Sequence, residues 1–189
     1  MRRITALMVA ALSALTLVGA APRAEAAEPF CGITWGSLEK RDDRFTSAHI
    51  IDLRAGRHEC YDRLVVDLGP RVPGLPGPDA AGYDVRYVHD VGPGESPELE
   101  PIDGAATLEI TVHAPALDDH YNPTYLPADH ERAVNVTGFS TFRQVYFWGT
   151  YEGQTEISLG VRARLPFRVF TLAGPGDGSR LVIDVAHRW

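Results

Sequence analysis

The stretch FRQVYFWGTYEGQTEISLGVR, residues 142–162, carries the clearest structural signal in the chain. Its last part, EISLGVR, alternates apolar and polar residues. This alternation puts the apolar side chains on one face of a β-strand and the polar ones on the other, as in an antiparallel sheet with one buried face. Glu152-Gly153 lies before this run and predicts a tight hairpin that joins a strand at 142–151 to a strand at 155–162.

Similar segments recur along the chain. LEITVH at 108–113 alternates in the same way, and the other runs rich in Val, Ile, Tyr, Phe and Thr are separated by turn residues. The predicted strands are residues 48–54, 61–68, 83–88, 106–114, 132–136, 142–151, 155–162, 167–172 and 180–186. A weakly amphipathic segment at 34–45 is the one candidate for a helix. We therefore predict an all-β fold, a β-sandwich of two small sheets with about nine strands and at most one short helix near the N-terminus.

The N-terminus is organised like a secretory signal. Arg2 and Arg3 precede an apolar run at 4–21, and an A-x-A pattern follows at 24–26. A membrane anchor is the alternative, but the run is rich in Ala and shorter than the about 20 strongly apolar residues of a spanning helix. We predict a cleaved signal peptide, residues 1–26, and a single secreted domain, residues 27–189, without a membrane span.

The expected mature chain is acidic. Removal of residues 1–26 takes away three arginines and one glutamate, which changes the formal net charge from −7 to −9. Nucleic-acid phosphates and anionic lipid headgroups bind basic surfaces. This charge balance therefore argues against nucleic acid or an anionic membrane as the main partner.

Cys31 and Cys60 are the only cysteines in the sequence. In an exported protein an even number of cysteines indicates disulfides, and two cysteines allow one pairing. The bond would close a loop of about 30 residues and stabilise the fold by about 3–4 kcal/mol. The alternative is a pair of free thiols, although no local signature supports a catalytic cysteine.

The sequence contains no recognisable catalytic or metal motif: G-x-S-x-G, a phosphate-binding loop, H-E-x-x-H and the EF-hand pattern are all missing. Two acidic clusters, DDH at 118–120 and DHE at 129–131, lie in a long loop with prolines. Their side chains are of the kind that binds Zn²⁺ or Ca²⁺, but the spacing matches no known site, and a solvated acidic loop suits this chain. We predict no catalytic residues, no metal and no cofactor.

The most distinctive group of side chains is aromatic. Alternation in 142–151 sends one set to the same side of the strand: Phe142, Gln144, Tyr146 and Trp148. Val145 and Phe147 go to the opposite side. If that opposite side faces the core, Tyr146 and Trp148 point outward with the Gln144 amide beside them, a composition that suits stacking against a sugar ring.

Two further tyrosines, Tyr121 and Tyr125 in the long loop, extend this predicted binding surface. The alternative is that Tyr146 and Trp148 are core residues, because large aromatic side chains are more often buried than used for binding.

Two segments of the chain are nearly identical, RLVVDL at 63–68 and RLVIDV at 180–185. Runs of consecutive apolar residues indicate strands that are covered on both faces. Another predicted strand follows the first segment at 83–88, and one precedes the second at 167–172. The repetition suggests two similar halves, such as two facing sheets.

The second of these segments belongs to a block that resembles a known family. PFRVFTL at 166–172, a Gly/Pro turn and SRLVIDV at 179–185 are similar to the aromatic-x-V-F-x-L and P-x-R-L-V-I-D pattern of AMIN domains. CGITWGSL at 31–38, AGRHECYDRLVVD at 55–67 and the closing AHRW resemble, more specifically, the AMIN-like secreted proteins of actinobacteria. The resemblance covers about residues 31–189.

AMIN domains are β-sandwiches of two small sheets in cell-wall amidases and secretin-type pore proteins, where they are non-catalytic targeting modules for peptidoglycan. The resemblance therefore implies an extracellular, non-catalytic binding module that associates with the bacterial cell wall, with peptidoglycan or another wall glycan as partner. We expect it to stand alone, without an amidase or secretin domain, and no known binding motif can be transferred to it. Two alternatives stay open: a secreted small hydrolase acting on the wall or on carbohydrate, and a cell-surface protein–protein adaptor.

Overall fold

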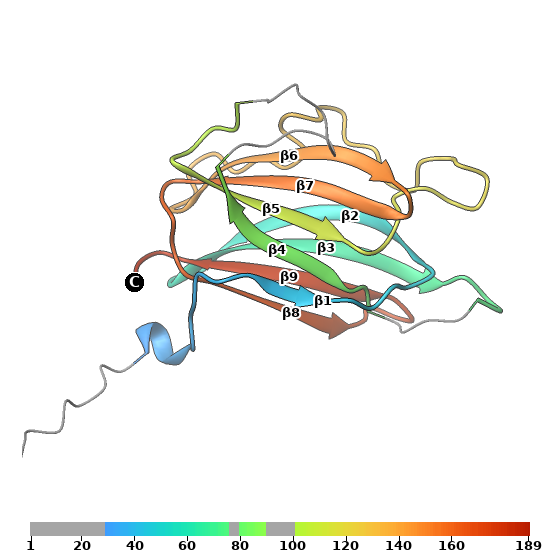
Figure 1. Ribbon diagram of the computed structural model, residues 1–189, viewed down its shortest axis with the longest axis horizontal. Coiled ribbons are helices and arrows are strands. Elements are labelled where there is room, and N and C mark those ends of the chain that lie inside the picture. The colour runs from blue at the N-terminus through green and yellow to red at the C-terminus, as the bar shows by residue number, and fades with distance from the viewer. Residues whose placement is uncertain (1–28, 76–79, 90–100) are drawn as a thin grey trace, which may run out of the picture.

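The structure, a computed structural model, describes residues 29–75, 80–89 and 101–189 and consists almost entirely of β-strands (Figure 1). Its elements are η1 (Phe30–Gly32), β1 (Lys40–Asp42), β2 (Ala48–Arg57), β3 (Tyr61–Arg71), β4 (Tyr83–Val88), β5 (Ala106–Val112), β6 (Phe142–Tyr151), β7 (Gln154–Val161), β8 (Phe167–Ala173) and β9 (Ser179–Ala186). The only helical element among these residues is the single 3₁₀ turn η1, near the N-terminus.

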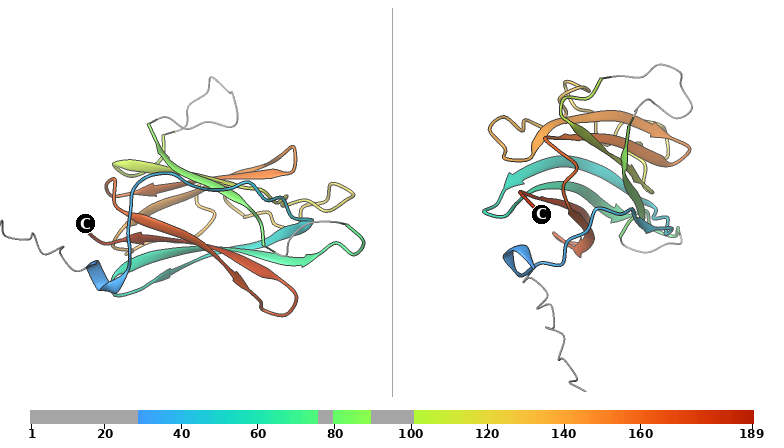
Figure 2. Two further views of the ribbon diagram at one scale, coloured as in Figure 1. Left: turned by 60° about the horizontal axis from the view of Figure 1, so that its bottom comes forward. Right: turned by 60° about the vertical axis from the view of Figure 1, so that its left-hand side comes forward.

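The strands form two antiparallel sheets, which lie over each other as two layers (Figures 1 and 2). The five-stranded sheet has the order β1-β4-β5-β7-β6, and the four-stranded sheet has the order β2-β3-β9-β8. Alternate side chains of both sheets point inward and form one apolar core, which includes Leu64, Val66, Leu108, Ile110, Ile157, Leu159, Leu181 and Ile183. The predicted all-β sandwich of about nine strands is confirmed.

The hairpin between β6 and β7 also forms as predicted. Tyr151 pairs with Gln154, so Glu152 and Gly153 make a two-residue turn. Their φ angles are 49° and 78°. Positive φ at both central residues is the geometry whose twist matches the flanking strands, and glycine adopts it without strain.

One predicted strand is wrong, and the candidate helix does not form. Residues 132–136 form no strand, although their backbone still lies along the edge of β6: the Ala133 N–H donates to the Val145 carbonyl, and the Phe147 N–H donates to the His130 carbonyl. Residues 34–45 contain no helix. They contain β1 instead, because the edge of β4 offers backbone hydrogen bonds to this charged segment, which has no apolar stripe to bury as a helix.

The two similar segments do not lie in facing sheets, so that expectation is wrong too. They are β3 and β9, which are hydrogen-bonded neighbours in the four-stranded sheet. Because they run antiparallel, the arginine that begins each segment pairs with the aspartate near the end of the other: Arg63 with Asp184, and Arg180 with Asp67.

Cys31 and Cys60 form the predicted disulfide, with their Cα atoms 6.4 Å apart. It ties the segment around η1 to the residue just before β3. The predicted signal peptide, residues 1–26, lies outside the residues that the structure describes. In the described residues, no helix combines the length and apolar character needed to cross a membrane.

Candidate binding surface

The side chains of β6 are distributed between the two faces of the five-stranded sheet. Val145 and Phe147 face the core, as predicted, and are almost fully buried. Phe142 faces the core as well, which corrects the expectation that it lies with Gln144 and Tyr146. The reason is a β-bulge between Phe142 and Gln144, where an extra residue shifts the alternation by one position.

Tyr146 and Trp148 form the aromatic pair on the outer face of β6. Their rings stack with centroids 4.1 Å apart and planes inclined by 25°. The Trp148 indole N–H donates to the Ser158 hydroxyl on β7 at 2.8 Å. Both rings are half-buried rather than core residues. A hydrogen bond and a stack hold the rings in place, so little rotamer entropy is left to lose when a ligand binds.

Polar side chains run across the sheet beside the aromatic pair. The register places Tyr146 opposite Ser158, Ser158 opposite Glu109, and Glu109 opposite Arg86. The Arg86 guanidinium and the Glu109 carboxylate form an ion pair of 2.5 Å. Arg86 is exposed, so this pair adds little to stability. Its hydrogen-bonding groups lie in the same row as Tyr146, Glu109 two strands away and Arg86 three strands away.

Gln144 is not available for ligand binding at this surface. Its side chain is buried, its Oε1 accepts from the Asp103 backbone N–H at 2.6 Å, and its Nε2 donates to the Glu131 carbonyl at 2.8 Å. The amide therefore holds two loop segments, those at Asp103 and Glu131, against the first part of β6. Sequence reasoning missed this role because both partners are backbone groups of loops.

The segment around Asp103 also explains why residue 160 is glycine. Gly160 pairs with Gln144 across the sheet, and a Cβ at this position would lie 2.0 Å from the Asp103 carbonyl oxygen. We expect Gly160→Ala to lower the free energy of unfolding by about 1–3 kcal/mol. The new methyl group forces the segment at Asp103 to move, and the hydrogen bond from the Asp103 N–H to the Gln144 side chain is lost.

Urea unfolding of Gly160→Ala and Gly56→Ala measures this effect. A Cβ at Gly56, also within a strand, would meet only the His58 side chain at 3.7 Å, so this control variant should be as stable as the wild type or more stable. Equal midpoints for the two variants would contradict the steric explanation.

Tyr125 lies on the inner side of β6, away from the aromatic pair. Its ring packs edge-to-face on Phe147, with centroids 5.2 Å apart. Burial, with a smaller contribution from the negative charge of Asp52, raises the pKa of Tyr125 to about 12. Tyr125 therefore supports the core rather than extending the binding surface.

Tyr121 lies in a different place, a groove of about 700 Å³ that it lines together with Tyr151, His49 and Glu152. Its side chain is 82% exposed and that of Tyr151 is 77% exposed. The loop is fixed by Asp118, whose Oδ1 accepts the backbone N–H groups of His120 and Asn122. Hydrogen bonds from Asn122 lower the pKa of Asp118, and the bond from the Asn122 side chain contributes more than the one from its backbone N–H.

In both acidic clusters of the long loop, the first aspartate stabilises a turn of the backbone. Asp118 fixes its own turn as described, and Asp129 Oδ1 accepts the backbone N–H groups of Glu131 and Arg132. No group of three or more His, Cys, Asp or Glu side chains is placed to hold a metal ion in the described part of the chain. That the protein needs no metal stays a prediction.

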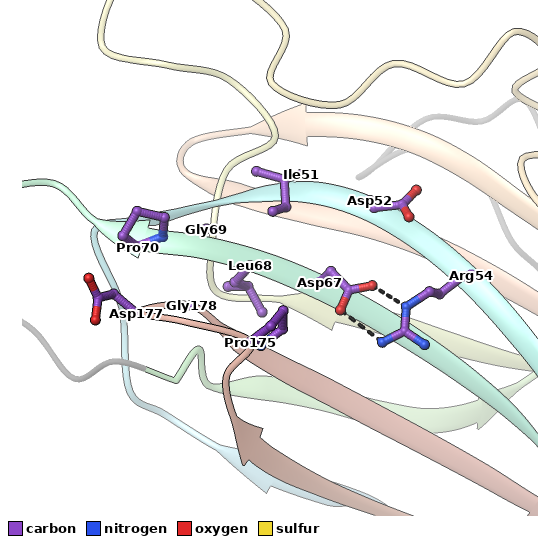
Figure 3. A pocket seen from close by; sticks show the side chains of 10 residues that line it. All are labelled: Ile51, Asp52, Arg54, Asp67, Leu68, Gly69, Pro70, Pro175, Asp177 and Gly178. Atoms are coloured by element: carbon purple, nitrogen blue, oxygen red, sulfur yellow. Dashed lines mark hydrogen bonds and ion pairs between the residues drawn. The ribbon is translucent and has the colours of Figure 1, made fainter.

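A second cavity, of about 550 Å³, opens on the four-stranded sheet (Figure 3). Its lining includes Leu68, Pro70 and Pro175, and Figure 3 shows the Arg54 guanidinium directed at the Asp67 carboxylate at one end. The Arg54–Asp67 ion pair measures 2.5 Å, and two further carboxylates, Asp52 and Asp177, also line the cavity. The lining is therefore acidic overall and does not suit an anionic ligand.

Comparison with known proteins gives one match. A protein-family model described as the AMIN-like domain matches residues 48–187. This range contains β2 to β9, and thus all of the four-stranded sheet and four of the five strands of the other. No curated protein and no solved structure matches the chain.

Proposed function

Because the chain belongs to the AMIN-like domain family, we propose that it is an extracellular, non-catalytic binding module that associates with the bacterial cell wall through the glycan of peptidoglycan. The family supports a binding module related to the cell wall. The aromatic pair Tyr146–Trp148 is the observation that carries the glycan as ligand.

The aromatic pair has the features that a sugar-stacking site requires. The apolar faces of pyranose rings pack flat on aromatic rings, while their hydroxyl groups need hydrogen-bonding partners around the rim. The rings of Tyr146 and Trp148 stack on each other, so one face of each is turned toward its neighbour, and the sugar packs on the outer side of the pair. The Arg86–Glu109 ion pair, two and three strands away in the same row, provides the hydrogen-bonding partners for a saccharide chain that extends across the sheet.

The disulfide supports an extracellular location. Disulfides persist in oxidising compartments and are rare in the cytosol. Cys31 and Cys60 form such a bond, and a signal peptide is the prediction for the residues that precede it.

Trp148→Ala should release the protein from the cell wall. The experiment uses the mature protein, residues 27–189, and measures how much of it co-sediments with purified insoluble peptidoglycan sacculi. We expect the variant to bind with an affinity about tenfold lower than that of the wild type, a loss of about 1.4 kcal/mol. The loss follows because the substitution removes both the indole and its stack on Tyr146. Sedimentation at low and at raised salt, with quantification of the bound protein, measures it.

Trp189→Ala is the matched control, since it removes an exposed indole from the end of the chain and should leave binding unchanged. The melting temperature of each variant shows whether its fold is intact. Wild-type protein that stays in the supernatant at every salt concentration would contradict the proposal and favour the adaptor hypothesis.

A further inference from the structure

The outer face of the four-stranded sheet, opposite to the aromatic pair, carries a row of charged side chains. Arg63 on β3, Asp184 on β9 and Arg168 on β8 are neighbours across the sheet. Asp184 is completely buried. Arg63 donates to its two carboxylate oxygens at 2.6 and 2.9 Å, and Arg168 approaches one of them at 2.7 and 2.8 Å.

Aromatic rings surround the two guanidinium groups. The guanidinium carbon of Arg168 lies 5.4 Å from the centroid of Trp35, 5.4 Å from that of Tyr61 and 5.0 Å from that of Phe170. Arg63 lies over Tyr61 and Phe170 at 5.2 and 5.5 Å. The arginine–aromatic cluster is the set of these side chains, namely Trp35, Tyr61, Arg63, Arg168, Phe170 and Asp184.

The cluster is positively charged on an acidic protein. Two guanidinium groups around one carboxylate leave one positive charge, whereas the whole chain has a formal net charge of −7. The arginine side chains are 22% and 31% exposed. A guanidinium has five N–H donors in a planar fork, so each arginine keeps donors beyond those given to Asp184, in a geometry that matches carboxylate and phosphate.

The neighbourhood of the cluster holds its rings in place. The residue of β2 opposite Arg63 is Gly56, and the His58 side chain lies beside it and stacks on Tyr61 with ring centroids 4.6 Å apart. The Trp35 indole N–H donates to the Phe30 carbonyl at 2.8 Å. The Cys31–Cys60 disulfide joins this N-terminal segment to the start of β3, beside Tyr61.

We propose that the arginine–aromatic cluster is a second binding site, for a carboxylate or phosphate group carried on a sugar whose ring lies against Trp35 and Phe170. The oxyanion binds the outward N–H donors of Arg63 and Arg168, and Asp184 keeps both guanidinium planes oriented. The aromatic rings contribute an apolar surface and, through cation–π contact, fix the arginines. This site lies on the other sheet from the aromatic pair and does not depend on it.

The three tryptophans allow the two sites to be observed separately. Trp35 is part of the cluster, Trp148 is part of the aromatic pair, and Trp189 belongs to neither. Each gives one indole N–H signal in a ¹⁵N–¹H spectrum of uniformly labelled residues 27–189. The probes are N-acetylmuramic acid, glucose 6-phosphate and N-acetylglucosamine, which carry a carboxylate, a phosphate and no charge.

We expect N-acetylmuramic acid, glucose 6-phosphate or both to shift the Trp35 signal in a saturable way at millimolar concentrations, while N-acetylglucosamine leaves it in place. A response to one acid alone identifies the group that the site prefers. Two results would overturn the proposal: no shift of the Trp35 signal with either acid up to about 50 mM, far above the range of a weak site, or an equal shift with the neutral sugar. The Trp148 signal reports on the aromatic pair, so failure of one site is distinguishable from failure of the other.

Arg168→Gln should lower the affinity for the acid, measured from the Trp35 signal, at least tenfold. The reason is that the substitution removes both the positive charge and the planar set of N–H donors. Arg168→Lys keeps the charge beside Asp184 and should retain the fold, with an affinity reduced several-fold because the planar fork is gone. Unchanged affinity in the glutamine variant would show that the Arg168 guanidinium contributes only to covering the sheet, and the proposal would fail.

Discussion

Asp62→Ala is expected to lower the free energy of unfolding by about 3–5 kcal/mol, which is the largest single-residue effect that we predict. Asp62 belongs to β3 but points inward and is completely buried. Its Oδ2 accepts the backbone N–H groups of Thr141 and Phe142 at 2.5 and 3.3 Å, and its Oδ1 lies 3.2 Å from the His187 Nε2. One carboxylate of the four-stranded sheet thus holds the start of β6 in the other sheet.

The size of the effect follows from what the substitution leaves behind. Two backbone N–H groups lose a charged acceptor in a place that water does not reach, and each unsatisfied donor costs about 1–3 kcal/mol. The removed carboxylate also leaves a small cavity, which adds to the loss. Asp62→Asn keeps an oxygen acceptor and should fall between the alanine variant and the wild type.

Urea unfolding followed by tryptophan fluorescence measures these differences. Asp67→Ala is the matched control, since Asp67 lies on the same strand but points outward, to the exposed Arg54. Its loss should cost no more than about 1 kcal/mol. If Asp62→Ala is no less stable than Asp67→Ala, the carboxylate does not join the two sheets in the way described.

Removal of the Cys31–Cys60 disulfide is expected to cost about 3–4 kcal/mol. The bond joins residues that are 29 apart in sequence and encloses β1 and β2. In the chain-entropy account, a cross-link over a loop of about 30 residues stabilises by limiting the unfolded chain. The folded sheets remain joined by the core when the bond is opened, so we expect a lower midpoint rather than a different fold.

The double variant Cys31→Ser, Cys60→Ser and the wild type reduced with dithiothreitol should unfold at the same urea concentration, below that of the oxidised wild type. The two preparations control for each other, since only one carries a substitution. A loss of less than about 1 kcal/mol would mean that the N-terminal segment is held mainly by other contacts. In the reduced protein the Trp35 indole signal should broaden or move, because the bond helps to hold that residue in the arginine–aromatic cluster.

The candidate site could be predicted only in part from the sequence. Alternation in β6 correctly separates Val145 and Phe147 from Tyr146 and Trp148. It misplaces Phe142, because a bulge has no signature in a run of aromatic residues. It also gives no sign that the Gln144 amide is used by two loops, or that Tyr125 packs inward on Phe147.

Eight of the nine strands in the described residues follow from the sequence, because the two-residue period of apolar side chains is a local property of a half-buried strand. The exceptions are β1, which the sequence does not predict, and residues 132–136, which form no strand. The sequence by itself also determined the hairpin at Glu152-Gly153 and the only possible disulfide. Strand neighbours and register were decided by the tertiary structure, because they depend on contacts between residues far apart in the chain. Arg63 and Asp184 are separated by 121 residues and meet only because β3 and β9 pair antiparallel. The arginine–aromatic cluster exists through that pairing.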